Sequence, residues 1–455
     1  MDLKRKFEKM LSANRFFNSE TADGADGRNP FENDYSRVVL SSYVRRLQDK
    51  AQVFPLAQND FVRTRLTHSM EVSCFAKGLG LGVEKFLLSR GLLDERRRDH
   101  IPSILETAGL VHDIGNPPFG HFGEESVRYF FRKLKTDKAS KTGQAYQTLP
   151  PEQRADFENF DGNAQGFRIL KSLAPNRHGN SFNLTFALLG TVVKYPFSSI
   201  DGNKKMGNPF QKKFGYFCSE RDAYQKISAE LGLAAGQRHP LTYLVESADD
   251  IAYSVCDIED GCKLDLIRLE DLREKFKGTD GETELQKLIE KGYSFDDDKE
   301  LFVQQFRIAM QSKMIRDVVK TFCDNIESIV NGDFKRDLLS ASDSATIREV
   351  FKVLGDINFS HKSVLKRELL GGTVITYLLN ILTDAVFSLS PDEKGTSKNN
   401  KIISLICSKK KDAEILKSAG NAYEKFQKIV DYVSGMTDSF ALRMYQEFTG
   451  KGGFE

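Results

Sequence analysis

The amino-acid sequence predicts an all-α fold. Apolar residues recur at helical spacing along most of the chain, and strand signals are few and short. In the segment 34–50, for example, Val38, Val39, Tyr43 and Leu47 recur at this spacing, with arginines between them. The length of 455 residues corresponds to roughly two to three domains, which is enough chain for a large helical core.

The first half of the chain is expected to alternate helices with two long loops. Residues 1–33 mix polar residues and glycines and are predicted to be an arm, anchored by Arg15-Phe16-Phe17. Thr67 is a candidate cap for the helix that carries His68. Polar composition predicts a surface loop or short lid near 135–158, and glycines and proline predict a second loop near 197–215. The helices expected here cover residues 34–50, 101–113, 121–134, 160–173, 185–195 and 240–262.

The second half is expected to be mainly helical, with one polar loop over 390–401. The helices predicted in this half cover residues 266–291, 302–331, 335–353, 364–387 and 412–445.

Composition excludes several classes of protein. The net charge is only +2, so bulk charge gives no argument for nucleic-acid or membrane-surface binding. No apolar run reaches the roughly 18 residues of a membrane span, and no apolar segment follows the basic N-terminus as in a signal peptide. The six cysteines are scattered without paired CxxC spacing, as expected of reduced thiols in a cytoplasmic protein.

The stretch from His112 to Glu124 concentrates functional side chains in thirteen residues, HDIGNPPFGHFGE. Asn116-Pro117-Pro118 breaks the preceding helix, because proline lacks an N–H donor and disfavours the helical conformation of the residue before it. The chain must therefore turn sharply just after His112 and Asp113. Adjacent buried imidazole and carboxylate groups each need a partner, and a bound cation would satisfy both.

Two distant stretches extend this pair into a predicted metal site. His68 lies upstream, and Asp249 with Asp250 lies downstream, so His68, His112, Asp113 and Asp249 form a set of two nitrogens and two oxygens. Either aspartate of the Asp249-Asp250 pair could be the ligand. Because the set has no thiolate, Mn, Mg and Co ions fit, and Fe, Ni and Zn are also compatible. The alternative is a pair of histidines satisfied inside a helical core.

Longer strings resemble the bacterial deoxyguanosine triphosphate triphosphohydrolases of the HD phosphohydrolase superfamily. These strings are RTRLTHSMEV, HDIGNPPFGHFGE, GNAQGFRIL, ESADDIAYSVCDIEDG and YVSGMTD. The resemblance covers nearly the whole chain. It implies an HD-domain helical core over 34–265, and a C-terminal helical region over 266–455 that completes the nucleotide pocket and the oligomer contacts.

His121 and Glu124 are the candidate catalytic pair. They are three residues apart and can touch on one helical turn, so the carboxylate could orient a histidine that exchanges protons near neutral pH. The resemblance implies the same catalytic part. The alternative is a pair that only steadies the metal ligands.

Substrate contacts are implied mainly by the resemblance. Asp249, Tyr253 and Asp257 are spaced i, i+4 and i+8, which places them on one helix face, and the resemblance gives Tyr253 and Asp257 to the deoxyribose. Gln52 matches a position near the sugar, and Glu368 is a modest match to the base-recognition region. Some relatives have His and Glu where this chain has Asn159 and Asp161. The residues assigned to the triphosphate are Arg65, Asn163, Lys194 and Lys213.

The expected activity is metal-dependent hydrolysis of dGTP, or of other dNTPs, to deoxynucleoside and tripolyphosphate by water attack at the α-phosphorus. The resembled family is typically hexameric, and some members bind single-stranded DNA. One alternative is an HD phosphodiesterase acting on cyclic or oligomeric nucleotides, against which the candidate triphosphate-binding lysines argue. Another is a non-catalytic nucleotide-sensing oligomer, against which the complete ligand set and the His121/Glu124 pair argue.

Overall fold

The computed structural model shows a fold made almost entirely of helices. Among the described residues, the only strands are β1 (Pro175–Asn176) and β2 (Gly179–Asn180), which pair antiparallel. The prediction of an all-α fold is confirmed. The structure describes residues 2–17, 26–56, 62–176, 179–202, 208–359, 362–389, 397–407, 410–418 and 420–451.

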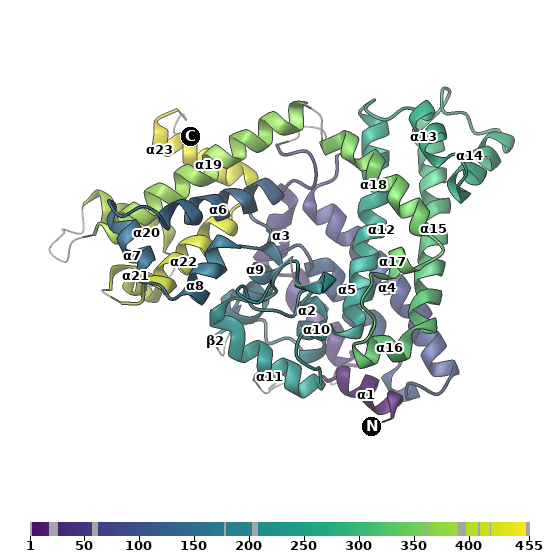
Figure 1. The fold of residues 1–455 in the computed structure, drawn as a ribbon, viewed down its shortest axis with the longest axis horizontal. Coiled ribbons are helices and arrows are strands. Elements are labelled where there is room, and N and C mark those ends of the chain that lie inside the picture. The colour runs from purple at the N-terminus through teal and green to yellow at the C-terminus, as the bar shows by residue number, and fades with distance from the viewer. Residues whose placement is uncertain are drawn as a thin grey trace.

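A first hydrophobic core lies between four long helices on the right in Figure 1: α4 (Arg65–Ser89), α5 (His100–Val111), α12 (Pro240–Lys263) and α15 (Lys299–Asp324). Helix α4 packs against α5, α12 and α15, so this core fixes the start of α4, the end of α5 and the middle of α12 relative to one another. The shorter helices around it are α1 (Leu3–Met10), α2 (Pro30–Val39), α3 (Ser42–Arg46), α10 (Phe186–Val192), α11 (Arg221–Leu231), α13 (Leu269–Phe276), α14 (Asp280–Glu290), α16 (Ile326–Asn331), α17 (Leu338–Ala341) and α18 (Ala345–Phe359).

A second hydrophobic core joins α6 (Gly120–Leu134) to α19 (Lys362–Phe387), α22 (Ala422–Ser434) and α23 (Asp438–Thr449), on the left in Figure 1. Residues on both sides of the predicted boundary at residue 265, such as Ile258 and Phe306, contribute to the first core. The remaining helices are α7 (Lys141–Gln147), α8 (Pro151–Glu158), α9 (Gly162–Arg168), α20 (Lys398–Ile406) and α21 (Lys410–Lys417), with short 3-10 or π turns at Leu47–Asp49, Glu95–Arg97, Ile169–Leu173, Pro209–Gln211 and Cys218–Glu220.

The prediction of a loop or lid near 135–158 is wrong. This segment forms α7 and α8, and it buries Tyr146 and Phe157 in the second core. The two rings pack against Phe131 and Phe426, with Phe131 and Phe157 stacked at 4.6 Å between centroids. A few large apolar residues therefore outweigh the polar composition that predicted a loop.

The N-terminal segment is more structured than an arm. Helix α1 buries Phe7 and Met10, and α2 begins at Pro30 with Asn29 as its cap, before the predicted boundary at residue 33. The predicted anchor is present, because the Arg15 guanidinium forms an ion pair with buried Asp34. The helix expected over 34–50 is interrupted, since Ser41 caps the separate helix α3.

The second predicted loop lacks an α-helix in its described part. Residues 197–202 and 208–215 contain bends, turns, the Pro209–Gln211 turn and an isolated parallel β-bridge from Ser198 to Tyr216, while residues 203–207 lie outside the described residues.

Helix α19 is an exception to the expectation that no segment is long and apolar enough for a membrane span. Val364–Phe387 is long and apolar enough to cross a membrane by length and composition, although it is 50% buried inside the protein. It packs against α6, α20, α22 and α23, as the core helix of a globular protein does.

Candidate active site

The sharp turn after α5 presents the central His-Asp pair. Helix α5 ends at Val111, and the Asn116 N–H donates to the Asp113 carbonyl at 3.2 Å within the turn that follows. A glycine is required at Gly115, because a Cβ there would lie 2.1 Å from the Gly162 carbonyl oxygen. The two prolines then lead to Phe119, whose φ of 61° begins α6. The turn therefore holds His112 and Asp113 against α9.

His68 and Asp249 reach this turn from two other helices. Thr64, and not Thr67 as predicted, caps α4, with its Oγ1 accepting from the Thr67 N–H at 3.3 Å. His68 lies in the first turn of that helix, and its Nε2 is 3.2 Å from Asp249 Oδ1. The same oxygen lies 3.5 Å from His112 Nε2.

The four predicted ligands therefore converge. One ligand atom each from His68, His112 and Asp113 lies within 4.8 Å of the others, and Asp249 contacts both histidines. A cation between these atoms would be bound by residues from three segments that are far apart in the chain.

The two ring nitrogens of His112 have different surroundings, which suit a metal ligand. Its Nδ1 lies 2.7 Å from the Gly109 carbonyl oxygen, which can only accept, so Nδ1 carries a proton and Nε2 faces the cluster. This Nε2 is buried and has no hydrogen-bond partner among the described residues. A buried ring nitrogen without a partner is costly, and a metal ion would remove that cost.

The charges of the cluster suit the binding of a cation. Burial opposes protonation of His112, but the carboxylates of Asp113 and Asp249 outweigh it and raise the His112 pKa to about 9. Burial likewise opposes ionisation of Asp113, but the Arg65 guanidinium and His112 hold its pKa below the usual range. Two buried carboxylates require compensating positive charge, which His112 and Arg65 supply here and which a bound cation could also supply.

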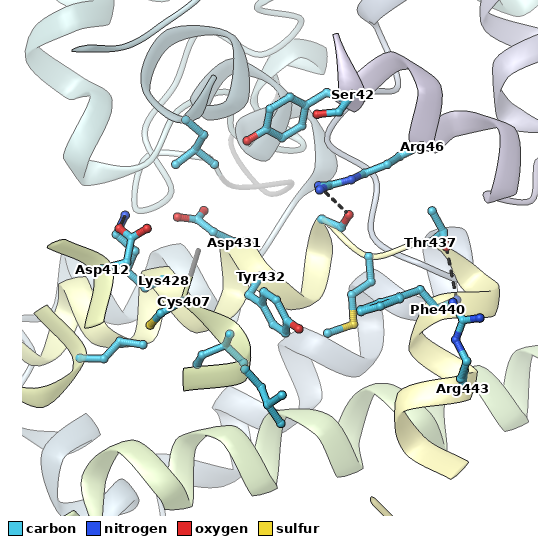
Figure 2. Close-up of a pocket in the computed structure, with 17 residues that line it drawn as sticks. Ser42, Arg46, Cys407, Asp412, Lys428, Asp431, Tyr432, Thr437, Phe440 and Arg443 are labelled. Carbon is cyan, nitrogen blue, oxygen red and sulfur yellow. Dashed lines mark hydrogen bonds and ion pairs between the residues drawn. The ribbon is translucent and has the colours of Figure 1, made fainter. Parts of the chain in front are cut away.

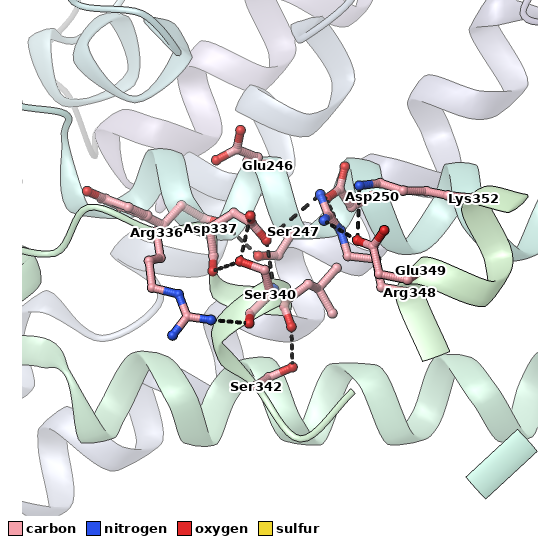
Figure 3. Close-up of polar contacts among 12 residues, drawn as sticks. Glu246, Ser247, Asp250, Arg336, Asp337, Ser340, Ser342, Arg348, Glu349 and Lys352 are labelled. Atoms are coloured by element: carbon pink, nitrogen blue, oxygen red, sulfur yellow. Dashed lines mark hydrogen bonds and ion pairs between the residues drawn. The ribbon is translucent and has the colours of Figure 1, made fainter. Parts of the chain in front are cut away.

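The structure distinguishes the two adjacent aspartates. The Arg348 guanidinium of α18 donates to Asp250 Oδ2 through Nε at 2.9 Å and Nη2 at 2.6 Å, as Figure 3 shows. Burial raises the pKa of Asp250 to about 6. Asp250 thus faces α18, while Asp249 faces the histidines.

The candidate catalytic pair forms as expected. His121 Nδ1 lies 3.3 Å from Glu124 Oε2, with the His121 side chain 83% exposed and the Glu124 side chain 2% exposed. Glu124 also accepts from the Gly162 N–H at 2.7 Å and from Arg128 Nη2 at 3.3 Å. A fixed, buried carboxylate therefore orients an accessible imidazole.

The contact between the two side chains favours the charged form of each, the imidazolium of His121 and the carboxylate of Glu124. The hydrogen bond to Glu124 raises the pKa of His121 above its ordinary value. Burial would raise the pKa of Glu124, but the bond from His121 and the charge of Lys213 lower it to about 2. Glu124 is thus a carboxylate at any physiological pH.

The basic residues assigned to the triphosphate are paired with carboxylates. Arg65 forms an ion pair with Asp113 and donates to the Ala51 carbonyl at 2.9 Å. Lys213 Nζ lies 2.9 Å from Asp161 Oδ2, and Asn163 Nδ2 donates to the same carboxylate, to Oδ1 at 2.7 Å. Lys194 Nζ lies 3.5 Å from Glu246 Oε1.

The residues assigned to sugar and base are placed less completely. Gln52 Oε1 is buried without a hydrogen-bond partner among the described residues, so it is an acceptor in need of a donor. Glu368 lies on α19, where burial raises its pKa and the His121 charge partly opposes that shift. Tyr253 lies one turn after Asp249 on α12. The side chain of Asp257 lies outside the described residues.

Three residues around the site were missed by the sequence prediction. Glu246 pairs with Lys194 and Arg238, Arg348 holds Asp250, and Arg128 holds Glu124. The i, i+4 spacing of Glu124 and Arg128 was a readable signal. The contacts of Glu246 with Lys194 and of Arg348 with Asp250 join segments far apart in the chain, and helical spacing gives no indication of them.

A separate cavity of about 620 Å³ lies between α3 and the C-terminal helices. Figure 2 shows it lined by Arg46, Tyr432, Thr437 and other residues, none of them from the predicted metal or catalytic sets. The cavity is therefore distinct from the candidate active site.

Comparison with known proteins agrees with this site. The family model of the HD domain matches residues 65–147, which include His68, His112 and Asp113, and that of the phosphohydrolase-associated domain matches residues 409–447. A deoxyguanosinetriphosphate triphosphohydrolase-like protein of Listeria monocytogenes is 36% identical over 468 residues, covering 98% of this chain and 99% of the relative. A protein of the same description from Synechocystis is 32% identical, again covering 98% of this chain and 99% of the relative.

A relative without the qualifier "like" is the deoxyguanosinetriphosphate triphosphohydrolase of Klebsiella pneumoniae. It is 34% identical over 388 residues, covering 77% of this chain and 76% of the relative. With identity above 30% across nearly the full length of several relatives, the chain belongs to the deoxyguanosinetriphosphate triphosphohydrolase family of HD-domain phosphohydrolases.

Proposed function

We propose that this enzyme hydrolyses dGTP, or another dNTP, to deoxynucleoside and intact tripolyphosphate by attack of water at the α-phosphorus. The observation that carries the proposal is the meeting of His68, His112, Asp113 and Asp249 around the buried Nε2 of His112, which has no hydrogen-bond partner among the described residues. The descriptions of the relatives supply the substrate class.

The four residues fit a divalent ion such as Mn, Mg or Co. Their imidazole and carboxylate donors suit such ions, and no thiolate is among them. When bound, the ion would supply Lewis acidity toward a phosphoryl oxygen and lower the pKa of a water molecule.

His121 and Glu124 would handle the protons of the reaction. His121 is exposed toward solvent, whereas Glu124 is buried and held by Gly162 and Arg128. A histidine so oriented can exchange a proton with a reacting oxygen, while Glu124 keeps the ring in place. His121 would therefore be the group that touches the substrate.

The triphosphate would be bound by Arg65, Lys194, Lys213 and Asn163. These groups contact the carboxylates of Asp113, Glu246 and Asp161. A polyphosphate carries several negative charges and offers many acceptor oxygens, so it would compete with these carboxylates for the same donors.

The nucleoside would lie between α12 and α19. Gln52 offers an unpaired acceptor to a sugar hydroxyl, and Tyr253 and Asp257 would read the deoxyribose. The Glu368 carboxylate could accept two hydrogen bonds from the N–H groups of guanine. Because Glu368 lies on α19, the region after residue 265 would complete the pocket begun by the HD core.

The proposal is tested by incubating the purified chain with Mn²⁺ and each of the four dNTPs separately, with phosphorus NMR to identify products. We expect tripolyphosphate from dGTP, and none from the His112→Ala variant. Pyrophosphate as the product, or turnover only of cyclic or oligomeric nucleotides, would contradict the proposal. We also expect a homohexamer, which native mass spectrometry would show.

A further inference from the structure

Two buried charged residues beside the active site belong to neither the metal set nor the catalytic pair. Lys50 is 4% exposed and Asp438 is 2% exposed. Lys50 directly follows the Leu47–Asp49 turn, and Asp438 is the first residue of α23. Charged side chains are rarely buried unless they are fully hydrogen-bonded, so their partners indicate what they do.

Lys50 joins the turn over residues 112–119, here called the metal-site turn, to the C-terminal region. Its Nζ donates to the Asn116 carbonyl at 2.5 Å and to the Ser434 carbonyl at 2.9 Å. The Asn116 side chain in turn donates from Nδ2 to Asp113 Oδ1 at 2.9 Å. Lys50 therefore holds the residue that orients a metal ligand.

Asp438 holds the other end of the same turn. Its Oδ1 accepts from the Phe119 N–H at 2.9 Å, and its Oδ2 accepts from the Ala51 N–H at 3.1 Å. Phe119 has a φ of 61°, an unfavourable value for a residue with a bulky side chain, and it begins the helix that carries His121 and Glu124. The bond to Asp438 stabilises Phe119 in this conformation.

The segment next to Lys50 also touches the metal set. The Ala51 carbonyl accepts from Arg65, which pairs with Asp113, and the Lys50 carbonyl accepts from the Arg65 N–H at 2.9 Å. Thr437 caps α23 at the turn seen in Figure 2, so the Asp438 carboxylate is placed by a helix start that is itself fixed. Lys50 and Asp438 are therefore connected by hydrogen bonds both to the proposed metal ligands and to the start of the helix that carries the candidate catalytic pair.

We propose that Lys50 and Asp438 are positioning residues for the hydrolysis. They tie the C-terminal helices to both ends of the 112–119 turn, and they set the position of His121 and Glu124 relative to His112 and Asp113. The C-terminal region thereby acts on the reaction through the metal-site turn. This inference rests on the proposed function, because it concerns the geometry of that reaction.

The test compares Asp438→Asn with Asp156→Asn. Asp156 is a matched control, because it is also fully buried and bonds a C-terminal helix through the Tyr423 hydroxyl at 2.6 Å. Its other partners are Ser199 and Cys218, neither of which lies in the metal-site turn. Both variants keep the side-chain volume, and each loses one carboxylate oxygen.

We expect Asp438→Asn to weaken Mn²⁺ affinity or lower kcat for dGTP about tenfold or more, with KM changed less, because groups that orient ligands carry effects of about this size. Free Mn²⁺ is read by electron paramagnetic resonance, and rates are expressed per folded molecule. Asp156→Asn should leave both quantities near the wild-type values. Lys50→Met should resemble Asp438→Asn, and Lys50→Arg, which keeps donors for the two carbonyls, should recover part of the loss.

The inference is overturned if Asp438→Asn and Lys50→Met retain wild-type kcat and Mn²⁺ affinity per folded molecule, or lose no more than Asp156→Asn. A wild-type protein that releases no tripolyphosphate contradicts the proposed function instead, so the two failures are distinguishable.

Discussion

At the scale of single residues, His112 is the side chain on which the proposed metal site should depend most. Its Nδ1 is committed to the Gly109 carbonyl, and its Nε2 has no hydrogen-bond partner among the described residues. We expect His112→Ala to lose both bound Mn²⁺ and turnover. His121→Ala is the matched variant, because it removes an imidazole outside the ligand set and should keep the metal. Metal content after gel filtration, measured by mass spectrometry, checks both, and Mn²⁺ retained at wild-type affinity in His112→Ala would contradict the assignment.

The neighbouring aspartates give a second comparison. Asp249 contacts both histidines, whereas Asp250 is held by Arg348. We therefore expect Asp249→Asn to lower Mn²⁺ affinity by about tenfold or more, and Asp250→Asn to change it far less. Titration with Mn²⁺ measures both affinities. An equal loss of Mn²⁺ affinity in the two variants would contradict the assignment of Asp249, because Asp250 faces α18 and not the histidines.

The pH dependence of the rate should reveal His121. Its hydrogen bond to Glu124 raises the His121 pKa, so the imidazolium persists to higher pH than in a free histidine and is lost as pH rises through the raised pKa. Glu124, with a pKa of about 2, stays ionised throughout. We expect a titration above pH of about 6.5 in kcat/KM that is absent from the slow His121→Ala variant. An unchanged profile and rate in that variant would exclude a catalytic role.

Much of the metal set could be predicted from the sequence, because His68, His112 and Asp113 lie in distinctive motifs. The choice between Asp249 and Asp250 could not, since adjacent residues on a helix point about 100° apart and only their tertiary neighbours decide which faces the site. The contact of Lys213 with Asp161 was equally unpredictable, because it joins a loop to a helix cap.

At the scale of elements, α8 shows how a polar segment can be held in a core. Asp156 accepts from the Ser199 and Tyr423 hydroxyls and from the Cys218 N–H. We expect Asp156→Ala to lower the free energy of unfolding by about 1–3 kcal/mol, because three buried donors lose their acceptor. Urea unfolding measures the change. Glu152→Ala, on the same helix with a half-exposed side chain, should stay within about 0.5 kcal/mol of wild type.

The same aspartate should affect stability at acid pH. Burial raises the Asp156 pKa to about 6, so the folded protein binds a proton that the unfolded chain releases between about pH 4 and 6. The stabilisation from this group is complete below pH 4 and is lost as pH rises through 6. Asp156→Asn should remove that part of the pH dependence, and an unchanged pH dependence would show that Asp156 titrates normally.

Helices with strong periodicity were predicted almost to their ends, as α6, α12 and α19 show against the expected 121–134, 240–262 and 364–387. The errors fell where one cap or a few aromatic rings decide the structure. Asn29 starts a helix inside the predicted arm, and Ser41 starts another inside the periodic run 34–50. Tyr146 and Phe157 fold a polar stretch onto the second core.

At the scale of the whole molecule, the candidate active site lies where the two cores meet. Helix α9 gives Phe167 to the first core and Ala164 to the second, and Gly115 of the metal-site turn contacts its backbone. The proposed metal ligands lie on α4 and α12 of the first core and in the turn directly after α5, while His121, Glu124 and Glu368 lie on helices of the second. The two cores together therefore set the distance between the ligands and the catalytic pair.

The central claim is that water attacks the α-phosphorus at the site formed by His68, His112, Asp113 and Asp249. Hydrolysis of dGTP by the Mn²⁺-loaded enzyme in water enriched in oxygen-18 tests it most directly, with the products resolved by mass spectrometry. We expect one labelled oxygen in tripolyphosphate and none in deoxyguanosine. Label in deoxyguanosine, or its appearance in orthophosphate or pyrophosphate released from dGTP, would contradict it.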